Sequence, residues 1–143
     1  IVGWEDNPIL QGTITKDEFY AASHVGVRIG PAATPSFTEG NLEALGRQRK
    51  VAAYVPNFSV MSWFLIGTNR LAVMQQRLAR AYEAVMPLRT APLPFELPAM
   101  RVMAQYHSAR SSDQGLRWLL AEVHAAADDI FDAEMTASQE ATI

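Results

Sequence analysis

Two short stretches place polar groups where a helix is expected to begin after a strand: Thr34-Pro35-Ser36 and Asn57-Phe58-Ser59. The first turn of a helix has free backbone N–H groups and a partial positive charge, which suit a carboxylate or a phenolate. Open α/β folds bind ligands at such positions, beyond the carboxyl ends of strands. The same residue types are common N-caps, so each could instead cap its own helix. These residues are candidate ligand-binding groups whose alternative role is local capping.

The other residues capable of chemistry lack the spacing that chemistry needs. The three histidines stand far apart, without an H-x-x-x-H pair, and are expected to be solvated or to cap turns. Arg70, Arg77 and Arg80 have the spacing of a solvated helix face. The sequence contains no phosphate-binding or dinucleotide-binding glycine motif and no nucleophile elbow. We therefore expect no catalytic residues, no metal and no cofactor.

The composition is that of an ordinary globular domain. The chain has 143 residues, of which 49% are hydrophobic and 19% are charged, so it can bury a core. Its net charge of -3 gives no basic footprint for nucleic acid. The absence of cysteine excludes disulfides and thiolate metal sites, and it fits a cytoplasmic protein. No apolar run reaches the roughly 20 residues of a membrane helix, so no membrane partner is expected.

Helices and strands alternate along residues 11–86. Apolar residues recur with helical spacing in some segments and alternate with polar residues in others. The expected elements are a helix at 14–22, a strand at 24–29, a helix at 35–45, a strand at 50–55, a helix at 60–66, a buried strand at 71–74 and a helix at 78–85. This alternation favours crossover units around a largely parallel sheet, which is an α/β fold.

Local signals mark several of the element ends. Thr15 and Glu18 have the spacing of a capping box. Thr34 is expected to be an N-cap with Pro35 at the first helical position, and Gly67 a left-handed C-cap. The residues expected to face the core are Val25, Val27 and Ile29 in the first strand, Phe37, Leu42 and Leu45 in the second helix, and Leu78, Ala81, Tyr82 and Val85 in the last.

Beyond Leu88 the pattern changes to an extended chain. Three prolines between residues 92 and 98 disfavour helix, and the alternation from Met100 to Tyr106 predicts a long strand. A final helix is expected to open at Ser111, which forms a second capping box with Gln114. Beyond Phe131 the periodicity is lost, which predicts a frayed tail. The residues expected to be buried in the final helix are Leu116, Leu119, Leu120, Val123 and Ile130.

Taken in order, these segments resemble the effector-binding domain of LysR-type transcriptional regulators, above all the regulators of nodulation and aromatic-catabolism genes. The resemblance spans Val2 to about Val123. No single motif in it is highly specific, and its weight lies in the order and spacing of all the elements. The segments that carry it are Phe37 to Gly46, Lys50 to Tyr82, Pro87 to Arg110, and "SSDQGLRWLLAEV" at 111–123.

The resemblance implies a two-lobed domain like a type 2 periplasmic binding protein. On that pattern, 1–10 are the end of the first crossover strand and a turn, and 11–86 form lobe two. Residues 87–131 cross back and complete the C-terminal part of lobe one, and 132–143 are a tail. Because the first four residues resemble the end of a strand, we expect a longer protein. Its DNA contact would come from an N-terminal winged helix-turn-helix absent from this chain.

By the same resemblance, Gly67-Thr68 lies beside the interlobe cleft, and Phe95-Glu96 lies where the chain crosses back. Thr68 would offer its hydroxyl to an effector, and Phe95 would stack on an aromatic ring. The alternative role of Phe95 is packing between the lobes. These residues complete the set expected to bind the effector.

The expected function is that of a ligand sensor rather than an enzyme. A small aromatic or carboxylated inducer would bind in the interlobe cleft and so control DNA binding and transcription activation. The resemblance also implies a homodimer or homotetramer, with the helices Phe37 to Leu45 and Arg77 to Val85 as candidate contacts. The alternative is a lobe of a solute-binding protein or of an α/β enzyme. An upstream winged helix-turn-helix, or else a secretory leader, would separate the two.

Overall fold

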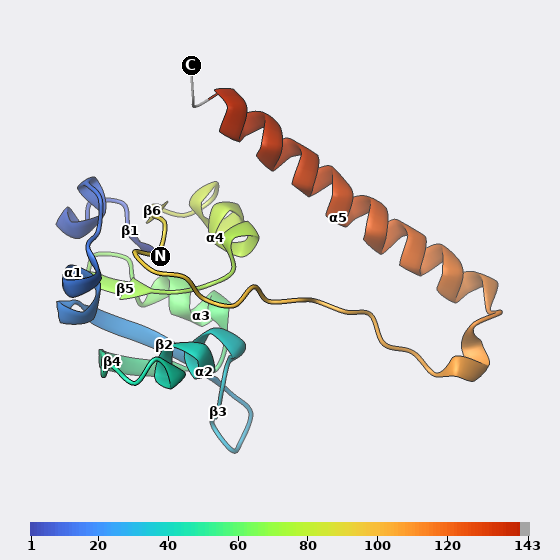
Figure 1. The fold of residues 1–143 in the computed structure, drawn as a ribbon, viewed down its shortest axis with the longest axis horizontal. Coiled ribbons are helices and arrows are strands. Elements are labelled where there is room, and N and C mark those ends of the chain that lie inside the picture. The colour runs from blue at the N-terminus through green and yellow to red at the C-terminus, as the bar shows by residue number, and fades with distance from the viewer. Residues whose placement is uncertain (141–143) are drawn as a thin grey trace. The chain divides into compact units, whose positions relative to one another are not determined.

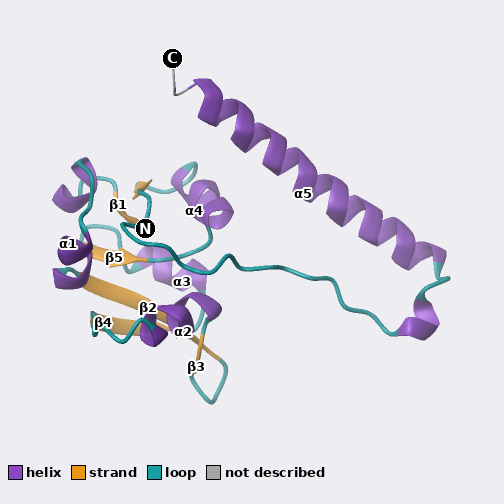
Figure 2. Cartoon of the chain, in the orientation of Figure 1, coloured by secondary structure: helices purple, strands orange, loops and turns teal. Residues whose placement is uncertain are grey.

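The computed structural model describes the backbone of residues 1–140 and the side chains of residues 1–127. The chain forms two compact units, Ile1–Met100 and Arg101–Ile143. The first unit contains a sheet with helices packed on it, and the second contains one long helix (Figures 1 and 2). Within residues 1–140 no helix combines the length and apolar character that crossing a bilayer would require.

The first unit follows the expected alternation of helices and strands. Its strands are β1 (Val2–Trp4), β2 (Ser23–Ile29), β3 (Thr34–Pro35), β4 (Lys50–Val55), β5 (Arg70–Ala72) and β6 (Leu88–Thr90). Its α-helices are α1 (Lys16–Ala21), α2 (Phe37–Ala44), α3 (Phe58–Trp63) and α4 (Gln76–Glu83), and a 3₁₀ turn occupies Pro8–Gln11. The order α1, β2, α2, β4, α3, β5, α4 confirms the sequence prediction.

The sheet is mixed rather than purely parallel. Strand β2 pairs in parallel with β4 on one side and β5 on the other. Strand β1 pairs antiparallel with β5 and with β6, and the two-residue strand β3 pairs antiparallel with the end of β2. The crossover units predicted from the sequence therefore supply the parallel strands, while β1 and β6 add the antiparallel ones.

Each face of the sheet has its own apolar cluster. On one face, Val25 and Val27 of β2 and Val55 of β4 pack with Met61 and Leu65. The cluster on the other face consists of Ile1, Leu10, Ile14, Phe19, Tyr20, Leu42, Leu71 and Val73. Burial of both faces is what α/β sheets require, because strands in their centre have no solvent-facing side.

Helix α1 begins as the sequence predicts. The Glu18 backbone N–H donates to Thr15 Oγ1 at 3.2 Å, and the Thr15 N–H donates to Glu18 Oε2 at 2.8 Å. This reciprocal pair is the predicted capping box. Ile14 and Phe19, which flank it, are both buried in the same cluster. The start of α1 is thereby tied to the core.

The core-facing residues of α2 and α4 were predicted only in part. Of the three residues predicted for α2, Leu42 is buried, whereas Phe37 and Leu45, the residue after the helix, are about half exposed. Helix α4 ends at Glu83, so Val85 lies outside it and is 79% exposed. Leu78 and Tyr82 of α4 are half-buried and pack against the core cluster as predicted, whereas the predicted Ala81 is exposed and Ala79 is the fully buried residue.

The second unit departs furthest from the prediction. Met100 and residues 101–107 have no strand structure and are exposed, because no neighbouring strand among the described residues offers them hydrogen bonds. Helix α5 (Gln114–Glu140) begins after Asp113, whose Oδ1 accepts from the Leu116 N–H at 3.1 Å, so Asp113 and not Ser111 is its cap. The helix continues past Phe131, where a frayed tail was expected.

Among the residues whose side chains are described, those on the apolar side of α5 are largely exposed. Leu119 and Val123, predicted to be buried, are 51% and 53% exposed, and Leu116 and Leu120 are half-buried. Trp118, on the same helix, is 65% exposed. The predicted burial of Ile130 lies outside the residues whose side chains are described.

Candidate functional site

The ends of β2 and β4 bring two of the candidate stretches to the same edge of the sheet. In the parallel register, Val27 of β2 lies opposite Val55 of β4. The Ser36 N–H donates to the Val27 carbonyl at 3.0 Å, which fixes the start of α2 at this edge. Asn57 follows Val55 by two residues and precedes α3. The carboxyl ends of two parallel strands thus carry two helix N-termini, the arrangement that binds ligands in open α/β folds.

Both helix starts at this edge are capped by their own side chains. Ser36 Oγ accepts from the Glu39 N–H at 3.2 Å, and Asn57 Oδ1 accepts from the Val60 N–H at 2.9 Å. Of Asn57 and Ser59, the two caps that the sequence allows for this helix, Asn57 is the one that forms. Capping uses one side-chain acceptor in each case, and it leaves the Asn57 amide group exposed at the edge.

Thr34 and Pro35 do not start a helix as predicted. They form β3, in which Thr34 lies opposite Ile29 and Pro35 opposite Arg28. The pairing holds both residues in extended conformation, so the cap moves to Ser36 and the helix starts at Phe37. Pro35 lacks an N–H donor, and a two-residue edge strand is one of the few sheet positions that tolerates it.

Ser59 is the candidate whose side chain is most available at this edge. Its hydroxyl lies 2.9 Å from the Tyr82 hydroxyl of α4, and Ser59 is exposed. Phe58, between the two polar residues, is half-buried and packs against the apolar cluster under α3. The Asn57-Phe58-Ser59 stretch therefore offers two polar side chains and one anchoring ring.

Gly67 and Thr68 lie at the opposite end of the sheet. Gly67 has φ +70°, which confirms its predicted left-handed conformation. It is not the helix C-cap as predicted, because α3 ends at Trp63 and Phe64 is the cap. The Thr68 hydroxyl donates to the Leu65 carbonyl at 2.8 Å and accepts from the Arg70 N–H at 3.2 Å. Because Arg70 lies opposite Ser23, the first residue of β2, this turn precedes the strands rather than following them. The structure does not bring Thr68 together with Ser36 and Asn57.

Phe95 packs against α1 and not at the helix-start edge. Its ring centroid lies 5.2 Å from that of Phe19, edge-on, and 5.9 Å from that of Tyr20, stacked. Lys16 Nζ stands 5.8 Å from the centre of the same ring. Glu96 is exposed. The alternative role of Phe95, packing, is therefore the one for which contacts exist within the first unit.

Sequence reasoning missed Arg28, which joins three elements at the helix-start edge. Its guanidinium lies 4.5 Å from the centre of the Tyr54 ring on β4 and pairs with Glu43 of α2 at 2.6 Å. It also donates to the Ala33 carbonyl at 3.3 Å, in the turn before β3. The available signal was the alternation of the strand, which places Arg28 on the same face as His24 and Gly26 and on the face opposite Val25 and Val27.

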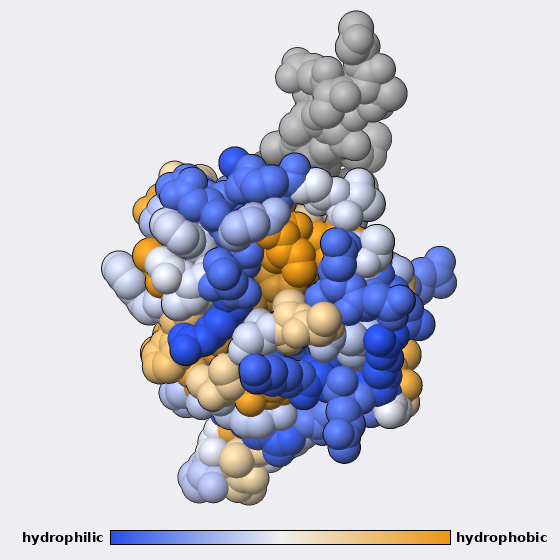
Figure 3. Space-filling model, turned by 90° about the vertical axis from the view of Figure 1, so that its left-hand side faces the viewer, coloured by the Kyte–Doolittle hydropathy of each residue, from blue (hydrophilic) through white to orange (hydrophobic). Residues whose placement is uncertain are grey.

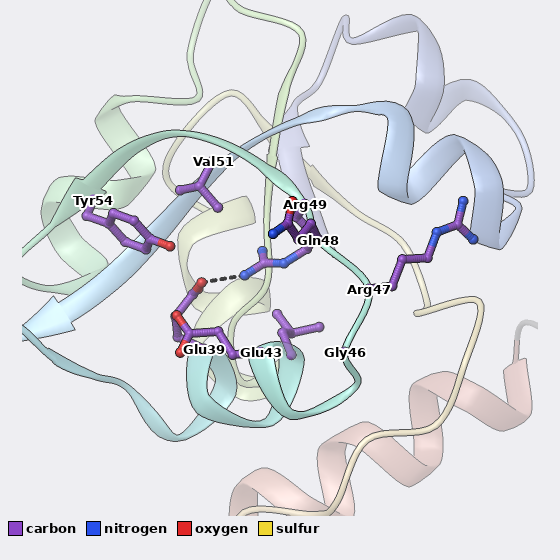
Figure 4. A pocket seen from close by; sticks show the side chains of 9 residues that line it. Glu39, Glu43, Gly46, Arg47, Gln48, Arg49, Val51 and Tyr54 are labelled. Carbon is purple, nitrogen blue, oxygen red and sulfur yellow. Dashed lines mark hydrogen bonds and ion pairs between the residues drawn. The ribbon is translucent and has the colours of Figure 1, made fainter.

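A second missed feature is a pocket of about 320 Å³ between α2 and β4 (Figure 4). Glu39 of α2 and Arg49 of the loop that leads into β4 form an ion pair in the wall of this pocket, and each side chain is 4% exposed. Burial raises the pKa of Glu39, although the Arg49 charge and hydrogen bond act in the opposite direction. Charged side chains this deeply buried are rare in proteins unless they are paired. The separation of ten residues between Glu39 and Arg49 in the sequence does not indicate such a pair.

His24 is the third missed feature, because a solvated histidine was expected. It is fully buried and lies edge-on to Phe19, with ring centroids 4.6 Å apart. Neither ring nitrogen makes a hydrogen bond of good geometry. The pKa of His24 is lowered to about 4, mainly by burial and secondly by the Arg49 charge, while a hydrogen bond with the Ala22 backbone acts in the opposite direction.

The other two histidines meet the expectation to different degrees. His107 Nδ1 accepts from the Ala109 N–H at 3.1 Å and so caps a 3₁₀ turn at Ser108–Arg110, as predicted for a histidine of this kind. His124 is exposed on α5. Among the residues with described side chains, no three His, Cys, Asp or Glu groups come close enough to hold a metal ion.

The chain is similar to curated regulators of nodulation. It is 36% identical over 118 residues to nodulation protein D 1 of Rhizobium leguminosarum bv. phaseoli and 34% identical over 118 residues to nodulation protein D 2 of Bradyrhizobium diazoefficiens. Both alignments cover 82% of this chain, but only 38% and 36% of the relatives, so the chain spans less than two-fifths of their length. No protein-family model matches the chain.

Solved structures of similar fold point the same way. The regulatory domain of MexT, a transcriptional activator in Pseudomonas aeruginosa, matches 85% of this chain and 60% of its own with a TM-score of 0.64 and 29% identity. The probable transcriptional regulator PA0477 of the same species matches 68% of this chain and 32% of its own, with a TM-score of 0.57 and 26% identity. The chain therefore belongs to the LysR-type transcriptional regulators, with the periplasmic-binding-protein-like fold of their regulatory domain.

Proposed function

We propose that this chain is the ligand-sensing part of a LysR-type regulator and that its effector binds at the edge formed by the ends of β2 and β4. The observation that carries the proposal is the parallel register of Val27 with Val55, which sets Ser36 and Asn57 side by side as neighbouring helix starts. Ser59 adds a hydroxyl that can exchange its Tyr82 partner for a ligand oxygen. The curated relatives are regulators and not enzymes, which supports sensing over catalysis.

The chemistry of this edge favours a small aromatic or carboxylated inducer. The exposed Asn57 amide and Ser59 hydroxyl donate hydrogen bonds, and the nearby helix start adds partial positive charge. Phe58 and Tyr82 place aromatic surface beside these donors. A carboxylate or phenolate would accept from the donors while its ring packs on that surface.

In the mechanism we propose, residues 11–86 form one lobe and residues 87–131 return to complete the other. Inducer bound between the lobes would stabilise one arrangement of the lobes over the other. The free energy of this shift equals the difference between the inducer's binding free energies for the two arrangements. The exposed apolar side of α5, with Trp118, Leu119 and Val123, supports this division because such a surface normally packs against a further part of the fold.

The partners follow from the same proposal. The regulator would act in the cytoplasm as a homodimer or homotetramer, and would contact DNA through a separate winged helix-turn-helix. Helices α2 and α4 are the proposed contacts between subunits. The exposed Phe37 and Leu45 of α2 are consistent with this role, since they contribute apolar surface outside the core.

Amide NMR of the 143-residue chain titrated with benzoate tests the site. We expect saturable shifts at Ser36 and at residues 57–60, and a weaker interaction with benzyl alcohol, which lacks the carboxylate. Replacing Ser59 with Ala should weaken benzoate binding about threefold to tenfold, the effect of one lost hydrogen bond. Thr68→Ala is the matched control, because Thr68 lies at the other end of the strands.

The result that would overturn the proposal is equally specific. Shifts confined to residues 67–68 or 95–96, or equal sensitivity to Ser59→Ala and Thr68→Ala, would place the ligand elsewhere. Absence of any residue-specific shift with benzoate, phenol or cyclohexanecarboxylate would remove the aromatic or carboxylated ligand class from the proposal.

A further inference from the structure

The pocket between α2 and β4 has walls of opposite charge. Glu39 and Glu43 stand one helical turn apart on α2 and form the acidic wall, while Arg47 and Arg49 come from the loop that leads into β4 (Figure 4). Two carboxylates thus stand beside the guanidinium of Arg49, whereas the guanidinium of Arg47 points away from them, toward Asp17 and the Tyr20 ring of α1 (Figure 4). A ligand with a single charge would be attracted by one wall and repelled by the other.

Each charged wall keeps unused hydrogen-bonding capacity. Glu39 accepts from Arg49 through Oε1, and Glu43 accepts from Arg28 through Oε1. In both carboxylates Oε2 receives no hydrogen bond from the part of the chain whose side chains are described. Arg49 uses only Nη2 for Glu39, and Arg47 uses only Nη1, for Asp17 at 2.9 Å. Glu39 Oε2 lies against Gly26 of β2, and the Arg47 guanidinium stacks on Tyr20. Glu43 Oε2 and the remaining N–H groups of Arg49 are therefore the free acceptor and the free donors at the cavity.

The rest of the lining is apolar or neutral. Leu42 lies on α2, Val51 and Tyr54 lie on β4, and Gln48 adds a neutral amide. The volume of about 320 Å³ is at the lower end of the roughly 300–1,000 Å³ typical of small-molecule sites. The whole lining belongs to the first unit, so the pocket is complete within Ile1–Met100. A small ligand with one apolar group and both charges fits this combination.

We propose that this pocket binds an α-amino acid with an apolar side chain, as a site separate from the edge that carries Ser36 and Asn57. The ammonium group donates to Glu43, and the carboxylate accepts from Arg49 and Gln48. The ammonium and carboxylate groups of an α-amino acid are close together, as are the acidic and basic walls, which the Glu39–Arg49 ion pair joins. The apolar side chain of the ligand packs on Leu42 and Val51. Charge-assisted hydrogen bonds of this kind are about twice as strong as neutral ones.

The site is connected to the proposed effector edge through one residue. Arg28 pairs with Glu43 of the acidic wall, stacks on Tyr54 of the lining and donates to the carbonyl of Ala33 before β3. A ligand that draws Glu43 toward its ammonium group changes the partner of Arg28. Occupation of the pocket would thereby act on the turn that leads to Ser36.

The test is an amide NMR titration of the 143-residue chain with leucine and with phenylalanine. We expect saturable shifts at Glu39, Glu43 and residues 46–51. N-acetyl-leucine lacks the ammonium group and leucine methyl ester lacks the carboxylate, and each should bind at least about tenfold more weakly, the equivalent of one lost charge-assisted contact. Glu43→Gln should weaken leucine binding similarly. Glu5→Gln, which changes an exposed carboxylate outside the pocket, should leave it unchanged.

Three results would overturn the proposal. The first is the absence of residue-specific shifts with either amino acid at up to about 10 mM, a concentration that reveals even weak sites. The second is equal binding of leucine and its blocked derivatives. The third is a set of shifts at residues 39–54 that depend on protein concentration alone. The last would mean that a second copy of the chain fills the pocket. Because benzoate reports on Ser36 and residues 57–60, failure here is distinguishable from failure of the proposed effector site.

Discussion

Replacing His24 with Leu should remove the part of the pH dependence of stability that His24 causes between about pH 7 and pH 5. His24 is fully buried against Phe19 and has no hydrogen bond of good geometry, so its charged form is strongly disfavoured. Its pKa falls from 6.5 to about 4, with burial as the main cause and Arg49 as the second. The folded protein therefore binds fewer protons at this ring than the unfolded chain does.

The sign and size of the effect follow from proton linkage. The contribution of the neutral His24 ring to stability is fully present above pH 6.5, the pKa of the unfolded histidine, and is lost as the pH falls toward 4. From those two values, the free energy of unfolding should drop by about 2 kcal/mol by pH 5 and by about 3 kcal/mol by pH 4. Glu39 acts with the opposite sign, because its raised pKa favours the protonated folded state as the pH falls. Comparing the variant with the parent protein cancels this common contribution.

Urea unfolding followed by tryptophan fluorescence and circular dichroism measures the effect. At about pH 7 the His24→Leu variant should be as stable as the parent or more stable, because a buried polar ring without partners is replaced by an apolar side chain of similar size. At about pH 5 it should exceed the parent by about 2 kcal/mol. A parallel decline of the two proteins between these pH values would refute the reasoning and would mean that the His24 ring reaches water.

Three further substitutions test other parts of the fold by urea unfolding. Arg49→Met should cost about 3 kcal/mol, because it leaves Glu39 buried without its partner, and the double variant Glu39→Leu/Arg49→Met should recover most of that loss; a single variant as stable as the parent would show a hydrated pair. Gly26→Ala should cost about 2 kcal/mol, since the new Cβ would lie 2.7 Å from the Tyr54 ring, and a neutral effect would contradict this packing. Thr15→Ala should cost about 1 kcal/mol through loss of the capping box, and an unchanged midpoint would show that the box is not formed in solution.

Local sequence signals were sufficient wherever one short segment decides the structure. The capping box at Thr15 and Glu18, the cap at Asn57 and the left-handed Gly67 were all predictable, because each depends on residues within one turn of one another. The alternation in β2 correctly placed Val25 and Val27 in the core. Ile29, at the end of that strand, is 52% exposed because the valine cluster does not extend that far.

Features that depend on distant residues were not predictable. Pairing of Thr34 and Pro35 with β2 overrides a good helix-start signal, because the strand edge offers hydrogen bonds that local propensity does not include. The alternation from Met100 to Tyr106 satisfies the pattern of a strand, yet a strand requires a neighbour. Periodicity reports which side of an element is apolar, and not whether a partner exists.

The candidate site shows the same division. The sequence correctly placed Asn57 at the start of a helix after a strand, and the register of β2 with β4 then adds Ser36 to the same edge. Thr68 and Phe95 entered the set through resemblance alone, and the strand order separates them from that edge. The Glu39–Arg49 pair escaped prediction because ion pairs between a helix and a loop have no fixed sequence spacing.

Hydrogen exchange of the full-length regulator, with and without its inducer, tests most directly whether the edge at β2 and β4 senses ligand. Inducer should slow exchange of the amides at residues 33–37 and 57–60, because these would become part of a closed cleft. The amides of residues 67–70, at the other end of the strands, should be unchanged. Protection of the second group without the first would contradict the account.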